Sequence, residues 1–329
     1  MNLGAFRFFL ASLVAISHLW SGMIHGPAAY SVWGFYLISG YLMGYVLNEN
    51  YNFTKKGLTQ FYCNRIIRIY PGYIFSILIG IIVYKICKLN LIDLNALNPE
   101  YAKPIGLQSI LFNVTLLPIF QTNQLLVPVS QALGLEVGFY LLAPLISVNR
   151  YCAYLAVVIT AGINWKLNIV PDTFGARYSG YWSALLPFSL GIVIFFHRKS
   201  LIKFSKLKVA TFFWILHGLV WLYFPSYPWE YGLYISMIFT AFVLVSNANV
   251  KSGKFDQILG DMSYIVYLLH TTIGYFLLAS YQFDEPRNFK FFLYTYIVTC
   301  IVSILFVLTI ERRIQFKLKH FLGKYYVKN

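Results

Sequence analysis

Residues 6–25 read FRFFLASLVAISHLWSGMIH, and Arg7 is the one charged side chain among them when histidine is neutral. About 20 consecutive apolar residues are what an α-helix needs to cross a membrane. On such a helix Arg7 and His18 share one face and lie about 16 Å apart along the axis. An ionisable side chain inside a membrane span costs free energy and usually serves a function. The stretch therefore predicts a spanning helix with two candidates for chemistry.

The composition of the whole chain predicts many such spans. Of its 329 residues, 59% are hydrophobic, 19% aromatic and 11% charged, whereas soluble domains carry about 25% charged residues. Long apolar runs separated by short polar breaks are typical of polytopic α-helical membrane proteins. The net charge of +15 comes from Lys and Arg clustered in the short breaks, as the positive-inside rule produces. No basic, aromatic-rich patch stands outside the apolar runs, so nucleic-acid binding is not expected.

Ten apolar runs are interpreted as spans. They lie at about 6–25, 31–47, 69–87, 132–148, 151–166, 181–197, 209–224, 231–247, 263–280 and 290–310. One more apolar run, 105–120, is interrupted by Gln108, Asn113 and Pro118. If 105–120 does not cross and the N-terminus is cytoplasmic, 19 of the 26 basic residues fall on the cytoplasmic side. If it does cross, the basic cluster at 198–208 moves outside, against the positive-inside rule.

The charges therefore favour an all-α polytopic membrane protein with about ten transmembrane helices, both termini cytoplasmic and a single domain over 1–329. The segment 88–131 then becomes the longest outer element. We expect 105–120 to be a re-entrant or interfacial piece that covers a cavity, because irregular backbone at membrane depth must be buried in protein or line water. The last stretch, 311–329, mixes Lys with Phe, Leu and Tyr and is expected to form an interfacial cytoplasmic helix.

His18 and Glu136 are the candidates for acid–base chemistry. Histidine titrates near neutral pH and can act as a general base toward a hydroxyl. In the predicted topology His18 lies about two turns from the outer end of its span, and Glu136, the one acid inside a predicted span, lies about one turn from the outer surface. A carboxylate at that depth could orient the imidazole and stabilise its protonated form. The alternatives are a hydrogen-bonded packing histidine and a structural partner for Glu136, either an ion pair or a tyrosine hydroxyl.

Arg7, Arg65 and Arg68 gather at the predicted cytoplasmic face. Arginine offers paired donors to phosphate oxygens, so the three could bind a phosphorylated donor. Plain topology and snorkelling to headgroups are the alternative. Arg65 and Arg68 are spaced to lie on adjacent turns of one helix, and Pro71 fits either the first turn of a helix or a break. The four cysteines are scattered without ligand spacing, so neither a metal site nor a disulfide framework is expected.

Five blocks of sequence resemble the motifs of one family of membrane enzymes. They are Arg7 followed after ten residues by His18, FYLISGYL at 35–42, RIIRIYP at 65–71, LGLEVGFYLL at 133–142 and SYIVYLLH at 263–270. In this order they resemble the acyltransferase-3 family of membrane acyltransferases. The chain departs from that pattern in having Gln131-Ala132 where the family often has Trp-Ser, and Gly4-Ala5-Phe6 where many members have an Asp before the arginine. The Gln131 departure bears on the outer acceptor site.

The resemblance implies transfer of an acyl group, commonly acetyl, from cytoplasmic acyl-CoA (acetyl-CoA) to a hydroxyl of an extracytoplasmic or lipid-linked glycan. The arginines would hold the nucleotide phosphates, and a pantetheine arm would run along the helix face from Arg7 to His18. His18, supported by Glu136, would deprotonate the sugar hydroxyl. By analogy the acceptor would be a surface polysaccharide such as an O-antigen or capsule, and the location a bacterial inner membrane.

Ser39, Tyr140 and His270 are possible supporting residues. Ser39 is expected to be a small packing residue beside Gly40, with an acyl relay or an oxyanion donor as the alternative. Tyr140 is expected to be a structural hydroxyl partner. His270 lies nearer the predicted inner half, so packing or donor binding suits it better than proton transfer.

Two other classes of protein fit parts of the pattern. A transporter or flippase of a lipid-linked glycan would share the ten spans, the intramembrane acid and the basic total. It also predicts internal repeats with broken helices in corresponding halves, and the sequence has neither clearly. A structural membrane subunit gives no account of His18 and Glu136 at matching depth.

Overall fold

The computed structural model describes residues 3–23, 27–204, 206–224, 226–247, 250, 252–281, 283, 285–314 and 316–317, and these residues are mainly helical with no strand among them. The α-helices are α1 (Gly4–Leu19), α2 (Ala28–Val46), α3 (Lys55–Leu89), α4 (Gly106–Thr115), α5 (Ser130–Ser147), α6 (Arg150–Lys166), α7 (Phe174–Ser179), α8 (Tyr181–Leu201), α9 (Leu207–Tyr223), α10 (Gly232–Asn247), α11 (Lys254–Ser280) and α12 (Phe289–Phe306). Each of the ten predicted spans overlaps one of them in its described residues.

The helices have the length and apolar character of a membrane protein. Five are long and apolar enough to cross a bilayer, namely α3, α5, α8, α11 and α12 with its continuation to Ile314. α1, α9 and α10 are apolar but shorter. The all-helical architecture is thus confirmed for the described residues, while the number of crossings and the side on which the termini lie remain predictions.

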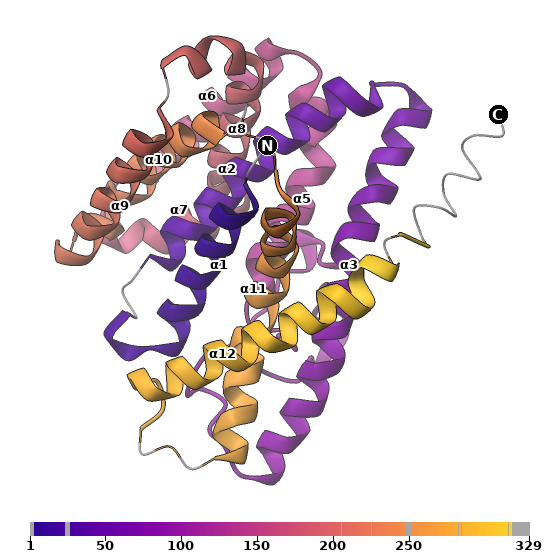
Figure 1. Ribbon diagram of the computed structural model, residues 1–329, viewed down its shortest axis with the longest axis vertical. Coiled ribbons are helices and arrows are strands. Elements are labelled where there is room, and N and C mark those ends of the chain that lie inside the picture. Colours follow the sequence, from indigo (N-terminus) through magenta and orange to yellow (C-terminus); the bar gives the residue numbers. More distant parts are fainter. Residues whose placement is uncertain are drawn as a thin grey trace.

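Two groups of helices pack side by side (Figure 1). α2, α5, α6, α8, α9 and α10 surround a core that includes Trp33, Phe139 and Phe188. α3, α11 and α12 surround a second core, in which the rings of Phe75 and Phe306 stack. α1 packs against both α2 and α11 and therefore stands at the junction of the groups. This position places the side chains of α1 between the two halves of the molecule.

α2 and α8 approach each other so closely that glycine is required at the contact. A Cβ atom at Gly40 of α2 would overlap the carbonyl oxygen of Phe188, and one at Gly191 of α8 would overlap that of Leu37. Small residues of this kind let membrane helices bring their backbones together. Gly40 therefore has a packing role that the sequence motif alone did not specify.

Gly40→Ala is expected to force α2 and α8 apart and to lower the free energy of unfolding by about 1–3 kcal/mol. Gly162→Ala is the matched control, because a Cβ at Gly162 of α6 meets nothing within 4 Å. Alanine favours a helix over glycine, so the control should be stabilised by about 0.5–1 kcal/mol. Unfolding followed by circular dichroism in detergent measures both. Equal effects of the two substitutions would contradict the close contact.

The first helix ends earlier than predicted. α1 stops at Leu19, whereas the predicted span runs to residue 25. Trp20 is extended, and the Ser21 N–H donates to the Arg287 carbonyl oxygen at 2.8 Å. Serine followed by glycine favours a turn over a helix, which accounts for the early end. His18 consequently lies in the last turn of α1 rather than two turns from its end.

α11 runs beside α1 in the same direction and continues past it. At one end the Ala5 N–H donates to the Asp256 carboxylate at 2.8 Å. At the other end the ring centroids of His18 and His270 lie 5.4 Å apart. From His270 the helix continues to Ser280, a rise of about 15 Å. His18 therefore lies about 15 Å short of the far end of α11 along the helix axis.

α3 is one continuous helix and not a span that begins near residue 69. It starts after Thr54, whose side chain accepts a hydrogen bond from the Gly57 N–H at 3.1 Å, as a helix cap does. Pro71 lies in the helix interior, so neither the first-turn nor the helix-break interpretation of this proline was correct. Arg65 and Arg68 stand on adjacent turns of α3, as their spacing predicted.

The segment between α3 and α5, residues 90–129, is called the cap. Its helix α4 has 10 residues, a length of about 15 Å, which is half of the hydrocarbon thickness of about 30 Å. The Leu125 N–H donates to the Glu100 carbonyl oxygen at 2.8 Å and clamps the two ends of the cap. The hydroxyls of Tyr70 and Tyr73 on α3 donate to carbonyl oxygens of α4 at 2.7 and 2.9 Å.

Two further predictions are not tested by the structure. The re-entrant placement of 105–120 remains a prediction, and most of the predicted helix over 311–329 lies outside the described residues.

Candidate functional site

His18 lines a cavity of about 210 Å³, here called the His18 cavity. α1, α2, α5 and α11 form its walls, and Tyr178 and Ser179 enter it from the end of α7. The cap closes it with two pairs of residues, Asn98 with Glu100 and Pro128 with Val129. The cap thus covers a cavity as expected, but the lining residues flank 105–120 and none of them belongs to it.

Glu136 lies elsewhere, in a smaller cavity of about 50 Å³ that Arg7 also lines. This space is called the Arg7 cavity. The hydroxyls of Ser39 and Tyr140 both donate to Oε1 of Glu136. Ser39 is therefore a positioning partner of Glu136 and does more than pack beside Gly40. Tyr140 is a hydroxyl partner, as expected.

The structure places His18 and Glu136 in different cavities and not as the predicted imidazole–carboxylate pair. The reason is the depth at which α5 begins. Gln131 and Ala132, in the first turn of α5, already line the His18 cavity. Glu136 lies more than a turn further along the helix, where it lines the same cavity as Arg7.

The two cavities share a wall. Val32, Tyr36, Ala132 and Tyr267 line both of them. The Tyr36 hydroxyl donates to the Ala132 carbonyl oxygen at 3.2 Å, and the Tyr267 hydroxyl donates to that of Val129 at 2.9 Å. These bonds hold two aromatic rings at the boundary. The boundary between the Arg7 and His18 cavities is therefore formed by side chains.

His270 lies beside His18, with the two ring centroids 5.4 Å apart, and its predicted position in the inner half of the membrane remains a prediction. Its Nδ1 atom is 3.1 Å from the Val266 carbonyl oxygen. With the proton on Nδ1, the ring keeps a lone pair on Nε2, and Nε2 is buried without a hydrogen-bond partner among the described residues. His270 is thus the nearest ring to His18 that could exchange a proton with it.

The two arginines of α3 have different surroundings. Nη1 of Arg68 lies 3.1 Å from Asp261 and 3.2 Å from Glu311, so this guanidinium is held by carboxylates of α11 and of the helical turn Val307–Glu311. Arg65 instead lies over the ring of Tyr140 at 5.9 Å. Its buried Nε has no hydrogen-bond partner within the described part of the chain. Of the pair, Arg65 has the donor available for a ligand.

Glu100 enters the His18 cavity from the cap and was not among the predicted site residues. Nε2 of Gln131 donates to its carboxylate at 2.7 Å, and its own N–H donates to Oδ1 of Asn98 at 2.9 Å. Burial raises the pKa of the Glu100 carboxyl to about 7. Nothing local in the sequence distinguishes this acid from other acids of the outer loops. The one available signal was Gln131, the departure from the family pattern, which is its partner.

The raised pKa of Glu100 predicts a pH-dependent stability. The folded protein favours the protonated carboxyl, so its stabilising effect is complete below the ordinary value of 4.5 and is lost as the pH rises through about 7. Glu100→Gln removes the titration and keeps an acceptor for Gln131. The unfolding temperature of the variant minus that of the wild type should therefore increase as the pH rises from 4.5 to about 7. A difference independent of pH would contradict the burial of this carboxyl.

Comparison with known families identifies the chain. A family model described as an acyltransferase domain matches residues 2–312. The chain belongs to the acyltransferase-3 family. The match extends from α1 to the end of α12, so both cavities of this acyltransferase-3 protein lie within the family domain. No curated protein and no solved structure matches the chain.

Membership confirms the resemblance carried by the five sequence blocks. It establishes the activity class of this acyltransferase-3 protein as acyl transfer and its location as a membrane. In the described residues all four cysteines are free thiols, and no group of three or more His, Cys, Asp or Glu side chains is placed to hold a metal ion.

Proposed function

We propose that this protein transfers an acyl group, acetyl in the first instance, from cytoplasmic acyl-CoA to a hydroxyl of a surface or lipid-linked polysaccharide. The supporting observation is the pair of adjoining cavities, one lined by Arg7 and the other by His18, that share Tyr36 and Tyr267. An acyl-CoA has an anionic head and a long thin arm, whereas a sugar is compact and polar. Two adjoining spaces, one lined by Arg7 and Glu136 and the other by His18 and Glu100, support separate donor and acceptor ends of the site.

The donor binds on the Arg7 side. Arg7 and Arg65 supply guanidinium donors to the phosphates, and the buried Nε of Arg65 supports this role. The Arg68 guanidinium forms ion pairs with Asp261 and Glu311. It can bind a phosphate only by releasing one of these carboxylates. Glu136 balances the charge of Arg7 in their common cavity, and it keeps Ser39 and Tyr140 oriented.

The chemistry takes place in the His18 cavity. His18 removes the proton from the acceptor hydroxyl as its oxygen forms a bond to the thioester carbonyl carbon. The carbon–sulfur bond then breaks, and the imidazolium returns the proton to the leaving thiolate. His270, with a lone pair on Nε2, lies close enough to support the imidazolium. Glu136 supports His18 only indirectly, through the donor site.

The sugar is held by polar groups of the cap and of the first turn of α5. Glu100 and Gln131 line the outer part of the His18 cavity together with Asn98. Carboxylate and amide groups form paired hydrogen bonds with sugar hydroxyls, and Tyr178 offers a ring for the sugar face. The cap side then faces away from the cytoplasm, in the inner membrane of a bacterium.

The test is a transfer assay with defined sides. Purified protein in sealed liposomes is given acyl-CoA with a labelled acyl group on one side and the polysaccharide or its lipid-linked precursor on the other. Label should enter the glycan only when the donor is on the Arg7 side. Movement of unlabelled glycan across the bilayer without acyl transfer would support the flippase alternative and contradict the proposal.

A further inference from the structure

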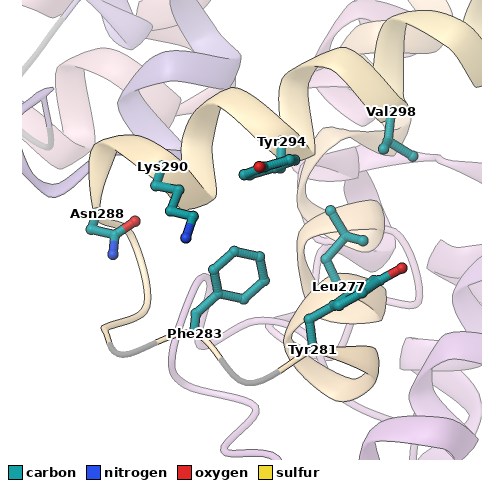
Figure 2. Close-up of a pocket in the computed structure, with 7 residues that line it drawn as sticks. All are labelled: Leu277, Tyr281, Phe283, Asn288, Lys290, Tyr294 and Val298. Carbon is teal, nitrogen blue, oxygen red and sulfur yellow. The ribbon is translucent and has the colours of Figure 1, made fainter.

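A groove lies between α11 and α12, close to the connection that joins them (Figure 2). Its volume is about 380 Å³, larger than either cavity of the candidate site. Leu277 of α11 and Phe283 of the connection form one side, and Lys290, Tyr294 and Val298 of α12 form the other. The groove is separate from the acyl-transfer site, because none of its lining residues lines the Arg7 or the His18 cavity.

The groove changes from charged to apolar along its length. Lys290, Tyr294 and Val298 follow one another at intervals of four residues, so they lie along one face of α12 over about 12 Å. Lys290 is the one charged residue among the described residues that line it. Figure 2 shows the Lys290 ammonium group beside the Phe283 ring, with Leu277 and Val298 further along. The lining therefore suits a molecule with an anionic head and an apolar tail.

The connection that borders the groove is fixed to the rest of the fold. Nε of Arg287 donates to the His18 carbonyl oxygen at 2.9 Å, and Nη2 donates to that of Leu97, also at 2.9 Å. Asn288 caps α12 by accepting a hydrogen bond from the Phe291 N–H at 2.7 Å. These bonds hold Arg287, Asn288 and the start of α12 in place beside the groove.

The exposed residues around the groove are those of a membrane interface. Tyr281 and Tyr294 are 64% and 52% exposed, and tyrosines of this kind gather where the acyl chains meet the headgroups. A lysine at the same level is placed to meet a lipid phosphate. We propose that the groove binds an anionic phospholipid, with its phosphate on Lys290 and an acyl chain along Tyr294 and Val298.

The test is lipid retention, measured by native mass spectrometry of the full-length protein from micelles with equal phosphatidylglycerol and phosphatidylcholine. The wild type should retain one phosphatidylglycerol. Lys290→Gln should lower that retention by about fivefold, since one lysine near a lipid surface contributes about 1 kcal/mol. The matched control is Lys166→Gln. Lys166 is also exposed and lies beside the exposed Trp165 at a helix end, but it lines none of the cavities described above.

Two further arms identify the ligand. Val298→Phe fills the apolar end without changing charge and should also lower retention, with unfolding in detergent showing that the variant is folded. Added inorganic phosphate should not displace the lipid, because it has no chain for the apolar end. The proposal is overturned if Lys166→Gln has the same effect as Lys290→Gln, if phosphatidylcholine is retained equally well, or if phosphate alone competes.

Discussion

His18→Ala is expected to reduce acyl transfer by about 10²–10⁴-fold, the range that a general base contributes. His18 lines the cavity assigned to the acceptor and is next to His270. No other described histidine lines that cavity. The rate of label transfer from acyl-CoA to glycan measures the effect, and donor affinity should change little because the phosphates bind at the other cavity.

The matched control is His197→Gln. His197 is half-buried on α8 and forms a hydrogen bond with Tyr154, and it lines neither cavity of the site. It should transfer label at the wild-type rate. Full activity of His18→Ala, or an equal loss in His197→Gln, would rule out His18 as the base.

Arg7→Gln and Glu136→Gln are each expected to stop transfer and to lower the free energy of unfolding by about 1–3 kcal/mol. Each change leaves the other residue charged in a cavity that no further charged side chain of the described chain lines. Glu136→Gln keeps an acceptor oxygen for Ser39 and Tyr140, so the loss reports the charge and not the hydrogen bonds. The double variant should regain about 0.5–3 kcal/mol relative to additivity yet remain inactive.

The two single variants and the double variant form a double-mutant cycle. The control cycle uses Arg198 and Glu49, an ion pair whose glutamate side chain is 44% exposed. Exposed pairs contribute about 0–1 kcal/mol, and neither residue lines a cavity of the site. Its double variant should keep full activity. If the Arg7 and Glu136 cycle shows no greater coupling than this pair, or if either single variant transfers normally, the two residues do not act together at the donor site.

The helices themselves could be predicted because apolar runs are local. All ten predicted spans overlap helices, and the two arginines of α3 lie on adjacent turns as their spacing required. Helix ends were less predictable. α1 stops at Leu19 because the following residues turn toward Arg287, and α3 continues through Pro71. Both outcomes depend on contacts with distant parts of the chain.

The sequence predicted which residues belong to the candidate site better than it predicted which of them lie together. Glu136 was predicted beside His18 and Arg7 beside Arg65 and Arg68, whereas the structure groups Arg7 with Glu136 and Ser39. His18 lies beside His270 instead. Depth explains the difference. Positions were counted from assumed membrane surfaces, but α5 begins beneath the cap and α11 extends beyond α1. Such offsets between helices are set by tertiary packing and have no signature in the local pattern.

Glu100 illustrates the same limit for loops. The cap brings it to the His18 cavity through backbone bonds between residues near 100 and 125. Hydrophobic periodicity says nothing about such a clamp, because the residues involved belong to no apolar run. The unusual Gln131 was noticed in the sequence, but its partner became evident only from the fold.

The boundary formed by the Tyr36 and Tyr267 side chains has a consequence for what can cross the bilayer. A rotation of the two rings would admit the narrow pantetheine arm, whereas a sugar or a nucleotide is too bulky to pass between them. In the proposed reaction the coenzyme returns to the compartment it came from and the glycan never leaves its own. Under this proposal the acyl group alone changes sides, so the glycan is modified on the far side of the membrane and no route opens for ions or metabolites.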